Sequence, residues 1–141
     1  MNIIEQYLEK PYWVIDILPQ QVPANGRGQY FKIEKYWRLQ LQFDLLCQKF
    51  SNLLIKLNCY YDISVHFDEE WTMNPFPGQI KEWMSSGKTV YVLLESGNAM
   101  IGFNGDDHYM TLYHPDMKLL ELIIPLAIAE GLFAWKPDGI G

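Results

Sequence analysis

The length, composition and charge of this chain exclude several broad classes of protein. At 141 residues it fits one domain, of a size that buries roughly 68–70% of its unfolded surface. Hydrophobic residues make up 49% of the chain and charged residues 20%, which excludes general disorder. The net charge of −6 argues against general nucleic-acid binding and against anionic membrane surfaces, because both interactions depend on Lys and Arg.

The N-terminal third predicts a short helix, a strand and an ambiguous segment. Residues 2–9 have apolar side chains at helical spacing, and Pro11 ends this helix. Residues 12–18 are rich in Val, Ile and aromatic residues, as in a strand. Residues 24–28 form a turn or loop. The apolar residues of 29–38 fit both the helical and the strand periodicity, and a helix is weakly favoured.

The clearest helix covers residues 39–57 and is followed by a strand. A single apolar stripe recurs there at spacings of three and four residues: Leu39, Phe43, Leu46, Phe50, Leu53 and Leu57. Residues 60–67 then alternate between apolar and polar side chains, which predicts a half-buried strand. After a loop, residues 77–86 predict a short helix.

The C-terminal third predicts an antiparallel meander and a buried helix. Residues 89–95, 99–103 and 108–113 form the three strands, and Asn104-Gly105 is a strong hairpin signal. Pro115 opens the last helix, with Asp116 in its first turn. The remaining features of this region are an almost wholly apolar helix surface, Pro125 inside the helix, Gly131 as a C-terminal cap, and a final strand at residues 132–135.

Together these elements predict an α+β fold in one domain spanning residues 1–141, with a mainly antiparallel sheet. The expected location is the cytoplasm, because residues 1–10 lack signal-peptide features. The longest apolar run, residues 122–129, is too short to cross a bilayer. Cys47 and Cys59 are expected to be reduced thiols.

The aromatic content is unusually high for a chain of this size. Five Trp, nine Tyr and seven Phe residues account for 15% of the sequence. A small core rarely hides so many rings, so we expect some of them in a groove, on the surface or at a subunit contact.

Two groups of polar residues could carry chemistry, although each has a structural explanation. Asp106 and Asp107 precede His108, but they fit a turn after Asn104-Gly105, and His114 is roughly 20 Å further along the strand. The second group lies on one face of the strand at residues 60–67 and its end: Asp62, Ser64, His66 and Asp68. Side chains at i and i+2 run parallel, which opposes a catalytic triad and favours a solvent-facing strand.

An acidic and aromatic loop at residues 68–76 is the clearest candidate for binding a partner. It combines acids that would attract a basic protein with rings that would supply contact energy: Asp68, Glu69, Glu70, Trp71 and Phe76. The alternative is a solvated connection whose Trp71 and Phe76 pack back onto the core.

The only net-basic region, residues 27–38, has two further interpretations. Its cations alternate with aromatic residues, as single-stranded nucleic acid would require, but a solvated helix face explains them more simply. The same region could complement the acidic loop of a second copy, so a homodimer is also an expectation. Phosphate-binding, C-x-x-C and G-x-S-x-G motifs are missing from the sequence, and we expect no cofactor and no metal.

Both ends of the chain resemble a family of small uncharacterised bacterial proteins of similar length. The similar segments are residues 2–19, beginning Asn-Ile-Ile-Glu-Gln-Tyr-Leu-Glu-Lys-Pro-Tyr-Trp, and residues 129–137, Ala-Glu-Gly-Leu-Phe-Ala-Trp-Lys-Pro. The resemblance implies a bacterial origin and a single domain. It implies no activity and no functional residue.

The leading hypothesis is therefore a non-catalytic interaction protein that uses the loop at residues 68–76, for example an acidic, immunity-like protein that caps a basic toxin. The alternative is a small hydrolase or ligand-binding enzyme that uses His66, Asp62 and His108, brought together by the sheet.

Overall fold

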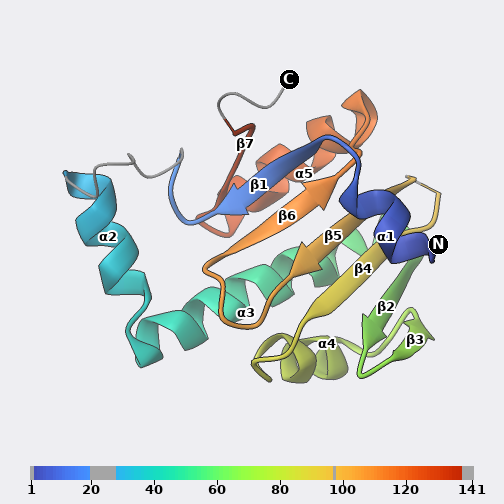
Figure 1. Cartoon of the computed structure of the whole chain (residues 1–141), viewed down its shortest axis with the longest axis horizontal. Helices are drawn as coiled ribbons and strands as arrows, with labels where there is room; N and C mark the ends of the chain where they lie inside the picture. Colours follow the sequence, from blue (N-terminus) through green and yellow to red (C-terminus); the bar gives the residue numbers. More distant parts are fainter. Residues whose placement is uncertain (1, 20–27, 97, 138–141) are drawn as a thin grey trace.

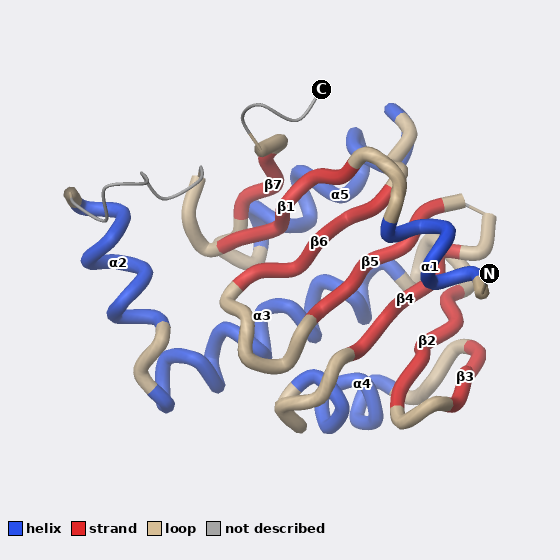
Figure 2. Tube along the Cα trace, in the orientation of Figure 1, coloured by secondary structure: helices blue, strands red, loops and turns tan. Residues whose placement is uncertain are grey.

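The computed structural model describes residues 2–19, 28–96 and 98–137, and within them it confirms the α+β fold class. The described residues form five helices and seven strands (Figure 1, Figure 2). In chain order these are α1 (Ile3–Leu8), β1 (Tyr12–Asp16), α2 (Gln29–Trp37), α3 (Gln40–Leu57), β2 (Ile63–Phe67), β3 (Glu70–Met73), α4 (Pro77–Met84), β4 (Val90–Leu94), β5 (Ala99–Phe103), β6 (Tyr109–Tyr113), α5 (Met117–Ala129) and β7 (Phe133–Trp135).

All seven strands belong to one antiparallel sheet with the order β3-β2-β4-β5-β6-β1-β7. The expected meander is present as β4, β5 and β6, which are neighbours in the sheet. The first strand, β1, inserts between β6 and the C-terminal β7 and pairs with both. The N-terminal and C-terminal parts of the chain therefore build the same end of the sheet.

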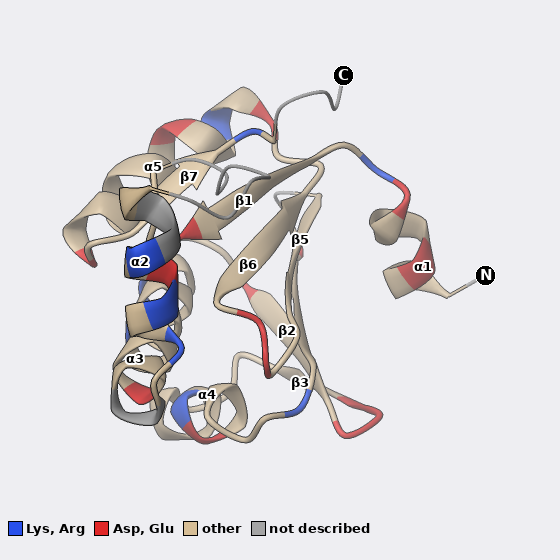
Figure 3. Ribbon diagram, turned by 60° about the vertical axis from the view of Figure 1, so that its left-hand side comes forward, with Lys and Arg blue, Asp and Glu red and all other residues tan. Residues whose placement is uncertain are grey.

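The helices are unequally divided between the two faces of the sheet. Figure 3 shows α3, α4 and α5 packed on one face and the short α1 on the other. The ambiguous residues 29–38 are helical, as weakly favoured, and α2 contacts α3. Most of the predicted turn at residues 24–28 lies outside the described residues.

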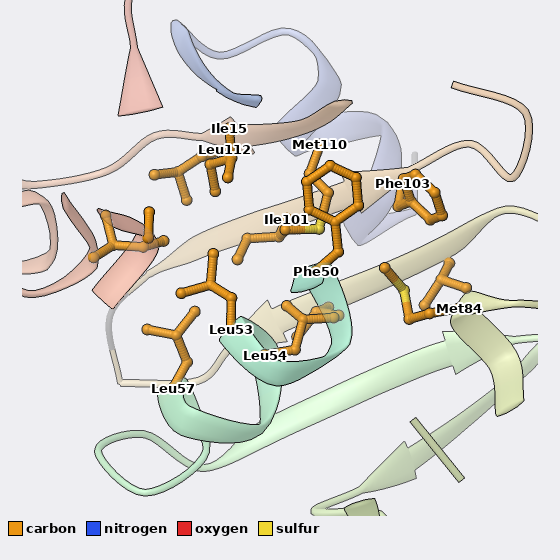
Figure 4. Close-up of a cluster of buried hydrophobic side chains, with 14 of the residues drawn as sticks. Ile15, Phe50, Leu53, Leu54, Leu57, Met84, Ile101, Phe103, Met110 and Leu112 are labelled. Carbon is orange, nitrogen blue, oxygen red and sulfur yellow. The ribbon is translucent and has the colours of Figure 1, made fainter. Parts of the chain in front are cut away.

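The hydrophobic core lies between the sheet and α3, α4 and α5. Figure 4 shows Phe50 and Leu53 of α3 pointing toward strand side chains such as Ile101. The ring of Phe50 lies 5.4 Å from that of Phe103, between ring centroids. The apolar stripe predicted on residues 39–57 supplies much of this core, except that Leu39 is exposed and Phe43 only partly buried.

Residues 68–73 form the turn and the outer strand of a hairpin and not the loop expected from the sequence, and only residues 74–76 form a connection, to α4. Strand β3 pairs with β2, and Asp68 and Glu69 form the two-residue turn between Phe67 and Glu70. Both turn residues have positive φ, 52° and 67°, the combination that a tight hairpin turn requires. The sequence analysis missed this turn because Asn-Gly or Asp-Gly is its usual signal.

Helix α5 has the expected ends but is not buried on all sides. Asp116 is its N-cap and not a first-turn residue, because the Asp116 side chain accepts a hydrogen bond from the Leu119 N–H at 2.8 Å. At the other end Gly131 has φ 78°, and the N–H of Leu132 donates to the Ala127 carbonyl, as in a Schellman motif. Met117 and Ile128 are exposed, so the expectation of complete burial was wrong.

Candidate functional site

The face of the sheet opposite α3, α4 and α5 carries a row of polar and aromatic side chains on β1 and β6. Because Ile15 belongs to the core and successive strand residues point to opposite faces, Tyr12, Val14 and Asp16 point away from it. The register pairs these three residues with Tyr113, Thr111 and Tyr109 of β6. Three cross-strand pairs therefore form a floor with Asp16 at one end and Tyr12 at the other.

A cavity of about 620 Å³ lies over this floor. This volume falls within the range of roughly 300–1,000 Å³ found for small-molecule sites. Glu34 of α2 and the connection between β5 and β6 close the Asp16 end, and α1 reaches the Tyr12 end. The full lining is Leu8, Tyr12, Val14, Asp16, Glu34, Asn104, Asp107, His108, Tyr109, Thr111, Tyr113, Trp135 and Pro137.

Asp16 is the most unusual residue of the cavity, because its carboxyl group is buried and incompletely hydrogen-bonded. Only 4% of the residue is exposed. Its Oδ1 is the one buried side-chain oxygen or nitrogen without a hydrogen-bond partner in the described part of the chain. Burial raises the pKa of Asp16 from 3.8 to about 7, although the backbone N–H groups of Leu18 and Ile17 favour the charged form.

Two polar contacts of Glu34 join α2 to the connection between β5 and β6. Arg38 Nη2 lies 3.5 Å from Glu34 Oε1, and His108 Nε2 lies 3.1 Å from Glu34 Oε2. Burial lowers the pKa of His108, an effect that Glu34 opposes and Arg38 reinforces. The imidazole is therefore neutral near pH 7 and donates its Nε2–H to Glu34, which leaves Nδ1 as an acceptor.

Tyrosines supply neutral hydrogen-bonding groups along the floor. Burial raises the pKa of Tyr109 and of Tyr113 above 10.0, so both phenols keep their protons at neutral pH. The rings of Tyr12 and Tyr113 lie 6.0 Å apart between centroids. On the neighbouring strand, the Trp135 indole is held by a 2.9 Å hydrogen bond from Nε1 to the Leu18 carbonyl.

The structure does not bring together His66, Asp62 and His108, the residues of the enzyme hypothesis. Strands β4 and β5 separate β2 from β6, a distance of about 14 Å at an interstrand spacing of about 4.8 Å. His66 instead packs against Trp71 at 4.9 Å, and Asp62 accepts a hydrogen bond from Asn74. Of the three, His108 alone lines the cavity.

The other polar candidates have structural roles. Asp107 belongs to a turn, since its N–H donates to the Asn104 carbonyl at 2.9 Å and its carboxylate accepts from the Asn104 amide. His114 lies at the far end of β6 from His108, with Nδ1 2.9 Å from the Asn98 carbonyl. Ser64 donates to Glu95 at 2.6 Å and not to His66, so it is not part of a triad.

The hairpin formed by β2 and β3 presents acids and apolar side chains to solvent, and Figure 3 shows acidic residues at its turn. Phe76 is 81% exposed, Met73 58% and Trp71 42%. The two aromatic residues therefore do not pack back into the core. We call this set of residues the hairpin surface: Asp68, Glu69, Glu70, Trp71, Met73 and Phe76.

The basic region at residues 27–38 is only partly described. Arg27 lies outside the described residues, and Arg38 is engaged with Glu34. The Tyr36 and Trp37 rings contact each other edge to face, 5.7 Å apart, and Trp37 packs against the core. Glu34, the one acid of this region, turned out to be the residue that points to the cavity.

The sequence analysis missed Asp16, Glu34 and most of the cavity floor. One signal was present: a charged residue interrupts the apolar strand Trp-Val-Ile-Asp-Ile-Leu at position 16. A carboxylate there must either face solvent or be buried at a cost in free energy. Tyr109, Tyr113 and Trp135, which looked like ordinary strand residues in the sequence, also line the cavity.

A comparison of the chain with family models, with curated proteins and with solved structures finds no match. The resemblance to a bacterial family therefore stays a prediction. Within residues 2–19, 28–96 and 98–137, no helix has the length and apolar content needed to cross a membrane. The same residues contain no group of three or more His, Cys, Asp and Glu side chains arranged to hold a metal ion.

The raised pKa of Asp16 predicts that the contribution of this residue to stability falls as the pH rises from about 4 to about 7. The folded chain holds this proton up to about pH 7 and the unfolded chain only to about 3.8, so unfolding releases a proton between these values. Asp16→Asn removes the free-energy cost of ionising a buried carboxyl group. We expect it to raise the free energy of unfolding near pH 8, by on the order of 4 kcal/mol at most, and to give no gain near pH 4.

Urea denaturation over this pH range measures the effect, with Asp62→Asn as the matched control because Asp62 is exposed. The control should follow the wild-type profile. A lower stability of Asp16→Asn than of the wild type near pH 8 would contradict the account.

Proposed function

We propose that this protein binds a small organic ligand in the cavity over β1 and β6, with the Asp16 carboxyl group as its anchor. The single observation that carries the proposal is the buried Asp16, a residue that lines a cavity of about 620 Å³ and whose Oδ1 has no hydrogen-bond partner.

The free energy of burial supports this proposal. Leaving a buried acceptor without a donor costs about 1–3 kcal/mol, and more when it is charged. A hydrophobic residue at position 16 would remove that cost, and in the empty protein the backbone N–H groups of Leu18 and Ile17 offset only part of the cost of burying the carboxyl group. A ligand that donates a hydrogen bond to Oδ1 would recover the lost interaction, which gives the carboxyl group a reason to be there.

The same geometry also favours different residues for any enzymatic activity. Asp16 has a pKa of about 7 and His108 is neutral, so both could exchange a proton with a bound ligand at neutral pH. His66 and Asp62 lie outside the cavity lining. A proton-transfer enzyme would therefore use Asp16 and His108, and an enzyme built on His66 and Asp62 is disfavoured.

Filling the cavity should abolish ligand binding. Thr111 lies in the middle pair of the floor, and Thr111→Trp would place an indole there. Ligand-detected NMR with a chemically mixed fragment library should find binders to the wild type, and these should bind Thr111→Trp more than about tenfold more weakly.

The matched control is Met73→Trp, which adds a ring to the same face of the sheet at its opposite edge. It should bind the fragments like the wild type, and thermal unfolding should show that both variants are folded. The proposal is wrong if no fragment binds the wild type, or if Thr111→Trp retains the binders.

A second function is favoured by the exposure of Phe76, Met73 and Trp71. We propose that the hairpin surface binds a basic protein, as expected of a cytoplasmic interaction module. Exposed apolar side chains lose contact with water on binding, and the neighbouring acids would steer a basic partner to them. The unpaired outer edge of β3 offers backbone groups to the same partner.

Removal of the Trp71 ring and of the Glu70 charge should disrupt the interaction with a basic protein. A purified partner, first captured on the immobilised wild type, should be basic and should bind the double variant Trp71→Ala/Glu70→Gln at least about tenfold more weakly. The control is Tyr60→Ala/Glu121→Gln, which removes an exposed ring and an exposed acid elsewhere.

Two results would contradict the interaction with a basic partner: capture of an acidic partner, or unchanged binding to the double variant. If the captured protein is a second copy of the chain, light scattering should show a dimer that the double variant lacks. That result would replace the basic partner with the expected homodimer.

A further inference from the structure

We infer that the ligand of the cavity is an organic cation with N–H donors, whose charged end binds at Asp16 and whose apolar part lies toward Tyr12 and Tyr113. This inference rests on the proposed function, since it names the chemical class of ligand for the same cavity.

The charge of the lining supports a cation. Three carboxyl groups, those of Asp16, Glu34 and Asp107, line the cavity, and the described lining contains no Lys or Arg. An anionic ligand would meet these carboxylates without a compensating positive charge, because His108 is neutral near pH 7 and Arg38 is 61% exposed in its pair with Glu34. A cation meets complementary charge.

The aromatic lining supports the same class of ligand. Tyr12, Tyr109, Tyr113 and Trp135 present rings to the cavity. The faces of aromatic rings attract cations, by about 0.5–2 kcal/mol for each contact, and they also stack on planar apolar groups. A ring-lined cavity with acids at one end is therefore suited to an amine or guanidine that carries an apolar group.

The two ends of the floor differ, and this difference orients the ligand. Asp16 pairs with Tyr109 across β1 and β6, and Glu34 approaches from α2. Four residues away, or about 13 Å along the strand, Tyr12 pairs with Tyr113, and Leu8 adds an apolar side chain. The positive end is thus expected near Asp16 and the apolar end between the two tyrosines.

The unpartnered oxygen of Asp16 further requires that the cation carries an N–H group. A quaternary ammonium satisfies the charge but cannot donate a hydrogen bond to Oδ1. A primary ammonium or a guanidinium supplies both, and hydrogen bonds between charged groups are about twice as strong as neutral ones. The cavity should therefore discriminate between these two kinds of cation.

Binding of such a cation should depend on pH. The ligand favours the ionised carboxylate, so Asp16 must release its proton, and affinity should fall by up to about tenfold for each pH unit below about 7. Other titratable groups at this end of the cavity modify this dependence: Tyr109 from β6, Glu34 from α2, and Asp107 and His108 from the connection before β6.

Four indole compounds of similar size separate the contributions of positive charge and of the N–H donor to binding. They are tryptamine, a primary amine; tryptophol, its neutral alcohol; N,N,N-trimethyltryptammonium, a cation without N–H at the charged nitrogen; and indolepropionate, an anion. Isothermal titration near pH 7.5 should show that tryptamine binds at least about tenfold more tightly than each of the other three.

A pair of variants assigns the preference to Asp16. Asp16→Asn should weaken tryptamine binding at least about tenfold and should change tryptophol binding by less than about threefold. Asp62→Asn, the matched change outside the cavity, should alter neither. Equal loss of both ligands in Asp16→Asn would show a general disturbance of the cavity and would overturn the assignment.

The outcomes distinguish this inference from the proposed function. The inference of a cationic ligand is wrong if tryptophol or indolepropionate binds as tightly as tryptamine. It is also wrong if none of the four compounds binds while library fragments do. In both cases the proposed binding of a ligand in the cavity is retained. Equal binding of the trimethyl compound overturns the need for an N–H donor. If neither the indoles nor the fragments bind, the proposed function fails as well.

Discussion

The pairing of β1 with β6 is the constraint on which the rest of this structure depends. It joins residues 12–16 to residues 109–113 and thereby connects the two ends of the chain. Because side chains alternate along a strand, this register places Ile15 in the core and Asp16 on the open face. A slip of one residue would bury the carboxyl group under α3 and α5 and move an isoleucine into the cavity. The fold and the site therefore depend on the same register.

The buried carboxyl group of Asp16 costs stability, and the proposed binding of a ligand in the cavity explains why it is there. The core is made of well-buried apolar side chains, and the other buried side-chain nitrogen and oxygen atoms of the described residues have hydrogen-bond partners. Asp16 departs from this pattern at the end of β1. Proteins commonly break such local rules at functional sites, where a group is held ready for a ligand at some cost in stability. The hairpin surface follows a different principle, since its exposed rings contribute little to folding and are available to a partner.

Local features of the fold could be predicted from the sequence, and long-range ones could not. The stripe from Leu46 to Leu57 and the hairpin signal between β5 and β6 are encoded by neighbouring residues, so α3 and the meander were expected correctly, although the connection is the longer turn from Asn104 to Asp107 and not a two-residue turn at Asn104-Gly105. Pairing of β1 with β6 joins segments separated by about two thirds of the chain, and periodicity carries no information about such partners. The cavity depends on that pairing, so Tyr12 and Tyr113 looked like ordinary strand residues. The turn at Asp68 and Glu69 was missed because two acids adopt a conformation usually taken by Asn and Gly.

The central claim is that Asp16 is a buried carboxyl group that binds the ligand. An NMR titration of its side-chain carboxyl carbon, without and with tryptamine, tests this claim most directly. The account predicts a pKa of about 7 in the free protein and a lower pKa in the presence of the amine, because the cation favours the ionised form. A pKa near 3.8 in the free protein, unchanged by the amine, would contradict both the burial of the carboxyl group and its role as anchor.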